Sequence, residues 1–87
     1  MLRRSKHDIV ADVLGELREP KVTTRIMYGA NLSYHQVKYY ERLLAERGII
    51  QKTNDSKWTL TEKGRKLLEL YTAVRKLSAE LENLLGY

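Results

Sequence analysis

The sequence of 87 residues contains no cysteine and only one proline. Without cysteine the chain can form neither disulfides nor thiolate metal sites, so it needs another source of stability, and oligomerisation is the obvious one. It also lacks a long apolar run that would cross a membrane, and its first residues are charged, unlike a signal peptide. We therefore expect a cytoplasmic protein with one small core and no membrane partner.

Patterns for catalysis and metal binding are missing as well. The two histidines, His7 and His35, fall in different predicted helices, with no acidic motif at metal-ligand spacing. No glycine-rich loop follows a predicted strand, and no Ser, His and Asp are placed as a triad. The glutamates, Glu41 and Glu46 among them, are scattered among Lys and Arg as on solvated helix faces. We expect no catalytic residues, no metal and no cofactor.

Positive charge is what the sequence has in excess. Sixteen Lys and Arg residues against eleven Asp and Glu give a formal net charge of +5. This balance favours an anionic partner, and nucleic acid before a membrane surface, because no basic amphipathic anchor is present. Arg3, Arg4 and Lys6 in the first segment could reach a phosphate, although a charged terminus is more often only a soluble one.

A first helix is predicted between Ser5 and Pro20. Ser5 and Asp8, three residues apart, read as a capping box at its start, and Pro20 closes the segment. Apolar residues at helical spacing give this helix one buried face, which is expected to pack against the segment that follows. These residues are Ile9, Val10, Val13, Leu14 and Leu17.

Residues 23–48 predict a helix-turn-helix. A short helix is followed by a tight turn at residues 29–32, and Ser33 then opens a longer helix. Gln36, three residues after Ser33, completes a capping box. Gly48 stands where a left-handed C-cap belongs, so the longer helix has a defined end.

The longer helix of this motif has two different faces. Val37, Tyr40 and Leu44 fall on one side at helical spacing and are predicted to be buried. The opposite side carries Tyr, His, Lys and Arg side chains, which suit base edges and phosphates. The residues predicted to contact DNA from this helix are Ser33, Tyr34, His35, Gln36, Lys38, Tyr39 and Arg42.

The start of the short helix is a second predicted DNA contact. Thr23 or Thr24 is expected to cap it. The free backbone N–H groups beside Thr24 and Arg25 then form a seat for a DNA phosphate. An ordinary solvated cap is an equally good interpretation of these residues.

Residues 49–60 are predicted to form a hairpin, because two short apolar stretches flank a polar turn. Trp58 and Leu60 share one face of the second strand, and Trp58 is read as part of the core in preference to a base-stacking residue. Lys52 and Lys57 flank the tip of the hairpin, where they contact phosphates or simply keep the loop solvated.

Thr61 is predicted to cap a last helix of roughly 25 residues, about 37 Å long. Leucine and valine repeat along it at alternating steps of three and four, and this heptad seam would stand in water unless a second chain covered it. We therefore predict a homodimer, with a monomer whose seam folds back on its own domain as the alternative. The seam residues are Leu67, Leu70, Val74, Leu77, Leu81 and Leu84.

The charges beside the seam favour one strand direction. A parallel pair sets no opposite charges against each other, whereas an antiparallel pair centred near Ala73 brings Lys66 of each chain to Glu80 of the other. Exposed pairs of this kind contribute only about 0.2 to 1 kcal/mol each, so they select direction and the seam supplies the stability.

The order of a helix, a helix-turn-helix, a two-stranded wing and a long final helix is that of a winged helix. The runs TRIMYGANLSY, RGII and WTLTEKG closely resemble archaeal winged helix-turn-helix DNA-binding proteins over about residues 24–64. Among these the chain is most similar to small basic dimers whose C-terminal helices form an antiparallel coiled coil. The resemblance implies DNA binding by helix 33–47 with support from the wing, in either local regulators or abundant nucleoid proteins.

Together these features predict a mainly α fold with a small β-hairpin (α+β), made of a DNA-binding domain at residues 1–60 and a dimerisation helix at 61–87. The predicted function is double-stranded DNA binding by a homodimer that inserts helix 33–47 into the major groove, as a transcriptional regulator or a nucleoid-associated protein. A protein-interaction module is the alternative, although its docking face would be more apolar. Double-stranded RNA has a deep, narrow major groove that fits a recognition helix poorly.

Overall fold

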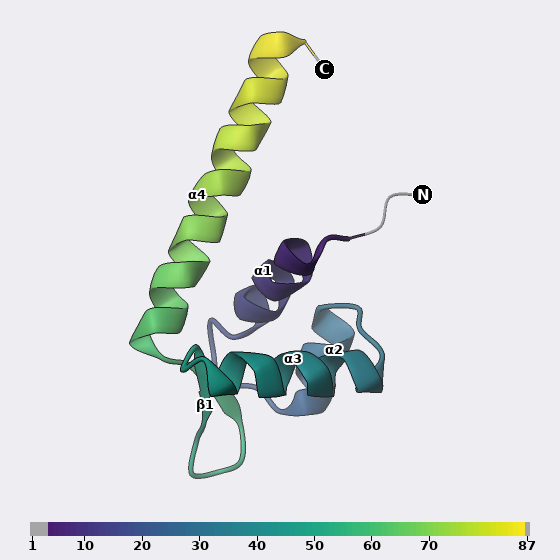
Figure 1. The fold of residues 1–87 in the computed structure, drawn as a ribbon, viewed down its shortest axis with the longest axis vertical. Coiled ribbons are helices and arrows are strands. Elements are labelled where there is room, and N and C mark those ends of the chain that lie inside the picture. Colours follow the sequence, from purple (N-terminus) through teal and green to yellow (C-terminus); the bar gives the residue numbers. More distant parts are fainter. Residues whose placement is uncertain (1–3, 87) are drawn as a thin grey trace.

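The computed structural model describes residues 4–86, so Arg3 lies outside the described residues. The described residues form four α-helices and one two-stranded antiparallel sheet, and α4 extends away from the rest of the molecule as a long arm (Figure 1). The predicted fold class, mainly helical with a small hairpin and a long last helix, is confirmed. The elements are α1 (Lys6–Glu16), α2 (Thr23–Gly29), α3 (Tyr34–Glu46), β1 (Ile50–Lys52), β2 (Trp58–Leu60) and α4 (Glu62–Leu85).

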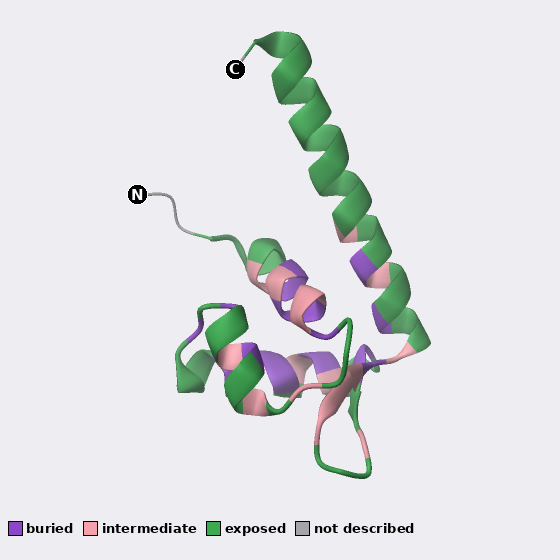
Figure 2. Cartoon of the chain, turned by 180° about the vertical axis from the view of Figure 1, so that it is seen from behind, coloured by how far each residue is buried: buried purple, intermediate pink, exposed green. Residues whose placement is uncertain are grey.

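The core lies where α1, α2, α3 and the hairpin meet, and Figure 2 shows its buried segments gathered there. Val13 and Leu14 of α1, Ile26 of α2 and Val37 of α3 are completely buried. Trp58 of β2 is half-buried against this cluster, as the alternation along the strand predicted. The predicted inner face of α3 is also confirmed, because Tyr40 and Leu44 are buried beside Val37.

The start of α2 differs from the sequence prediction. Its N-cap is Val22, no side chain caps it, and Thr23 is already its first residue. The prediction that Thr23 or Thr24 caps this helix was therefore wrong. The reason lies one residue earlier, since Lys21 exchanges two backbone hydrogen bonds with Trp58, of 3.0 and 2.8 Å. This bridge holds the chain extended through Val22, so the helix can begin only after it.

The long helix α4 is attached to the domain by its first turns. The Thr61 hydroxyl accepts a hydrogen bond from the backbone N–H of Gly64, as expected of an N-cap. Leu68 is buried in the core, and Leu67 and Tyr71 are half-buried against it. Beyond Tyr71 the remaining turns of the helix are exposed (Figure 2).

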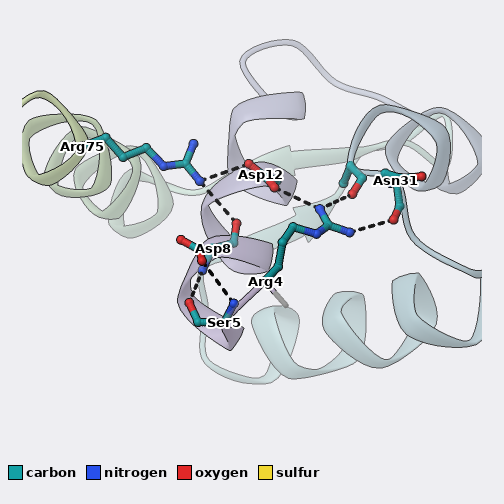
Figure 3. Close-up of polar contacts among 7 residues, drawn as sticks. Arg4, Ser5, Asp8, Asp12, Asn31 and Arg75 are labelled. Carbon is teal, nitrogen blue, oxygen red and sulfur yellow. Dashed lines mark hydrogen bonds and ion pairs between the residues drawn. The ribbon is translucent and has the colours of Figure 1, made fainter. Parts of the chain in front are cut away.

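Two arginines connect α1 to its neighbours through one carboxylate (Figure 3). Arg75 of α4 donates to Asp12 of α1 over 3.1 Å, and Arg4 donates to the other oxygen of Asp12 over 3.0 Å. Arg4 also donates to the carbonyl oxygens of Ala30 and Asn31, over 2.6 and 2.7 Å, in the turn between α2 and α3. Arg4, which the sequence offered as a phosphate contact, is exposed, but its guanidinium is already bonded to Asp12, Ala30 and Asn31.

The predicted capping box at the start of α1 is present. The Ser5 hydroxyl accepts from the backbone N–H of Asp8, and the Asp8 carboxylate accepts from the backbone N–H of Ser5 over 3.1 Å (Figure 3). These hydrogen bonds, the backbone one first, lower the pKa of Asp8 below its ordinary value. The Asp8 carboxylate of the cap therefore stays charged to a lower pH than a free aspartate does.

Candidate nucleic-acid interface

The start of α3 is fixed by the predicted capping box. The backbone N–H of Gln36 donates to the Ser33 hydroxyl over 3.1 Å, and the backbone N–H of Ser33 donates to the Gln36 side-chain oxygen over 2.9 Å. Both side chains, predicted to contact DNA, are exposed but engaged at the helix start. Their contribution is to fix where α3 begins, and Gly48 (φ +71°) ends it as predicted.

The outer side of α3 carries the remaining predicted contacts from this helix, and all of them are exposed. They line one shallow hollow of 370 Å³, which we call the outer hollow. The Tyr39 ring and the buried Tyr40 ring form a T-shaped pair with centroids 5.1 Å apart, and this contact favours one orientation of Tyr39. The structure therefore brings five separately predicted residues into one surface: Tyr34, His35, Lys38, Tyr39 and Arg42.

The predicted phosphate seat at α2 is weaker than the sequence suggested. Thr24 and Arg25 are exposed. The backbone N–H of Arg25, however, donates to the Val22 carbonyl over 3.1 Å, so it is not free for an anion. The Arg25 side chain remains available as a phosphate contact at this position.

The wing is a short hairpin in which Gln51 pairs with Thr59 and Lys52 with Trp58. The Lys52 amine lies 4.9 Å from the centroid of the Trp58 ring, a cation–π contact. At the tip, the Nζ atom of Lys57 lies 3.6 Å from Oδ2 of Asp55, an ion pair.

The hairpin tip is braced by its own side chains. The Thr53 hydroxyl donates to the Asp55 carboxylate, and this hydrogen bond is the largest cause that lowers the pKa of Asp55. The Thr53 hydroxyl in turn accepts from the backbone N–H of Lys57 over 3.0 Å. Lys52 at the end of β1 and Lys57 at the braced tip thus each have a partner inside the wing.

One buried charge was missed by the sequence reasoning. Glu41, which was read as part of a solvated face, is only 1% exposed, so that prediction was wrong. Its position four residues after Val37 and three before Leu44 places it on the buried side of α3, and that spacing was the available signal. Within residues 4–86, neither carboxylate oxygen has a hydrogen-bond partner.

The carboxylate of Glu41 borders a second hollow of 300 Å³, which we call the inner hollow. The Nζ atom of Lys38 lies 3.4 Å from Glu41 Oε1, close enough for an ion pair but not aligned as a hydrogen bond. The indole N–H of Trp58 is also buried, and it has no hydrogen-bond partner in the part of the chain that the structure describes. The residues that line this hollow are Lys38, Glu41, Arg42, Ala45, Glu46 and Trp58.

The seam of α4 is largely bare. Leu70, Val74, Leu77 and Leu81 are about 60% exposed and Leu84 is 85% exposed, whereas Leu67 is half-buried against its own domain. The alternative in which the seam folds back on the domain is therefore wrong from Leu70 onwards. An apolar stripe of this length is unusual on a chain this small.

Residues 4–86 hold neither a membrane-spanning helix nor a cluster of metal ligands. No helix there is long and apolar enough to cross a lipid bilayer. Over the same residues, no three His, Asp or Glu side chains gather closely enough to hold a metal ion.

The sequence of this chain is similar to a known protein family and to an archaeal protein. A family model described as "Winged helix-turn-helix" matches residues 3–79. An uncharacterised protein of Methanocaldococcus jannaschii is 38% identical over 66 residues, which is 75% of this chain and 67% of that protein.

Solved structures are similar over nearly the whole chain. Sso10a-2, a DNA-binding protein from Sulfolobus solfataricus, has a TM-score of 0.71 and 27% identity, covering 95% of this chain and 94% of that chain. A MarR family transcriptional regulator from Silicibacter pomeroyi has a TM-score of 0.73 and 21% identity, covering 90% of this chain and 60% of that chain. The second likeness is one of fold alone.

Proposed function

Since the chain belongs to the winged helix-turn-helix family and resembles archaeal members of it, we propose that it binds double-stranded DNA through the outer face of α3. It acts as a transcriptional regulator or a nucleoid-associated protein, in the cytoplasm and without a catalytic step. Sso10a-2, whose structure is similar over nearly all of both chains, is a DNA-binding protein, which supports this assignment.

The observation that carries the proposal is the contrast between the two sides of α3. Its inner side is consumed by the core, while its outer side is exposed and carries aromatic and cationic side chains in the outer hollow. Lys and Arg on such a face pair with phosphates or guanine edges, and the tyrosines offer hydroxyl groups and flat contact area. The N-terminal half of α3 enters the major groove, and Arg25, Lys52 and Lys57 contact the backbone on either side.

The working unit is proposed to be a homodimer joined through the exposed seam of α4. Each fully buried aliphatic side chain contributes roughly 1.5–3 kcal/mol, so a few paired seam residues suffice for a stable dimer. Antiparallel pairing places Lys66 against Glu80 of the partner and puts one winged domain at each end of the rod. The 24-residue helix is about 36 Å long, which is comparable to the 34–36 Å between neighbouring half-sites on DNA.

The function is tested by removing two cations from the outer hollow. The double variant Lys38→Ala with Arg42→Ala is expected to weaken duplex binding by about a hundredfold, because a phosphate or base contact made by a cation is worth about 1–3 kcal/mol and the variant removes both cations of the outer hollow. Fluorescence polarisation on a labelled duplex, at stated salt, measures the change.

A matched control removes the same charge elsewhere. Arg65→Ala with Lys76→Ala takes two exposed cations from α4, away from α3, and should change affinity far less. Equal losses in the two double variants would reject α3 as the contact surface. If wild-type binding to duplex is absent, or does not fall as salt rises, a protein-docking function replaces the proposal.

A further inference from the structure

Lys38 faces two sites at once. Its side chain lines the outer hollow, where DNA is proposed to bind, and also the neighbouring inner hollow. In the described structure its amine lies 3.4 Å from Glu41, and no other cation of residues 4–86 comes within ion-pair distance of that carboxylate. Arg42 lines the same two hollows but makes no ion pair among these residues.

Glu41 depends on this one amine. A buried carboxylate without hydrogen bonds has lost its water and gained little in return, so its remaining counter-charge is strongly retained. The lysine side chain, by contrast, is 45% exposed and flexible enough to reach outward. A phosphate that takes up this amine would leave Glu41 buried and unpaired.

We propose that Glu41 competes internally with DNA phosphate for Lys38 and so holds down the affinity of α3 for DNA. The inference rests on the proposed function, because it assumes that DNA binds the outer face of α3. Glu41 would act on this binding through Lys38 and not by touching DNA. While Lys38 is paired with Glu41, it adds little to the positive potential of the outer face. Arg42 carries the larger share of the cationic contact, and Glu41 sets how much Lys38 adds.

The competition predicts an unusual gain of binding. Glu41→Gln keeps the shape of the side chain but releases Lys38, so duplex affinity should rise about fivefold, and the salt dependence should steepen by about one phosphate, near 0.9 in log-log slope. Polarisation titrations at several salt concentrations measure both quantities.

The matched control is Glu46→Gln, which removes the same charge from the same helix at an exposed position lining the same hollow. It should raise affinity less than Glu41→Gln does. In a Lys38→Met background the two substitutions should become equivalent, because there is no lysine left to release. Circular dichroism melting confirms folding, and Glu41→Met replaces Glu41→Gln if the buried amide destabilises the domain.

A readout that leaves Glu41 in place comes from the cations. Lys38→Met should weaken duplex binding less than Arg42→Met does, since Lys38 is already partly neutralised. Equal gains from Glu41→Gln and Glu46→Gln, weaker binding of Glu41→Gln, or a gain that persists without Lys38 would overturn the inference. None of these results would contradict DNA binding itself, which fails only if the wild-type chain does not bind duplex.

Discussion

At the residue scale, Gly64 shows how closely α4 is fitted to the domain. A Cβ atom there would overlap the backbone carbonyl oxygen of Ile49. That carbonyl is held in place by the backbone N–H of Thr61, which donates to it over 3.0 Å, while the Thr61 hydroxyl is shared between it and the Gly48 carbonyl, at 3.0 and 2.6 Å. The position therefore requires glycine for space and not for its backbone freedom.

Gly64→Ala is expected to destabilise the protein by about 1–3 kcal/mol, the usual cost of overpacking a site that cannot relax. Gly15→Ala in α1 is the control, since a Cβ there meets nothing within 4 Å and alanine favours the helix by about 0.5–1 kcal/mol. Urea unfolding of the two variants measures both effects. A neutral Gly64→Ala would show that the start of α4 is looser than described.

Single charges were also the hardest features to predict from sequence. The spacing of Val37, Tyr40 and Leu44 correctly predicted the inner face of α3, because apolar burial follows helical geometry. Glu41 occupies the same face, but charged residues are rarely buried, and it was predicted to be solvated from its charge in spite of its position on the helix. Arg4 was likewise read by its charge, whereas its position follows from the carbonyl groups of a turn 26 residues away.

At the scale of elements, local signals predicted the helix starts whose caps are side chains. Ser5, Ser33 and Thr61 all cap as their sequence context indicated. The start of α2 could not be predicted in this way, because it is set by a backbone bridge between Lys21 and Trp58, which are far apart in the sequence. Tertiary pairing of this kind leaves no pattern in a local window.

The exposed seam of α4 gives the prediction that belongs to this scale. Val74→Asp with Leu77→Asp should convert a dimer into a monomer, since two charges would have to be buried in the paired seam. Thr72→Asp with Ala79→Asp adds the same charges to the opposite side of the helix and should leave the assembly unchanged. Sedimentation at micromolar concentration distinguishes the outcomes, and a wild-type chain that already sediments as a monomer would contradict the dimer.

At the scale of the whole molecule, the domain and the α4 arm present two different exposed surfaces. The outer side of α3 lines the outer hollow. The helix α4 leaves the domain as a long arm (Figure 1), and this arm carries its own exposed apolar stripe. The ion pairs from Arg75 through Asp12 to Arg4 connect the arm to the turn before α3. In the proposed dimer, this connection fixes the direction in which each recognition helix points.

The central claim is that duplex DNA contacts the outer face of α3, and a map of chemical shifts tests it most directly. Isotope-labelled wild-type protein is titrated with a short duplex while backbone amide signals are followed. The account predicts the largest changes at the outer hollow, in Tyr34, His35, Lys38, Tyr39 and Arg42, with smaller changes in the wing. Changes confined to α4, or none at all, would contradict it.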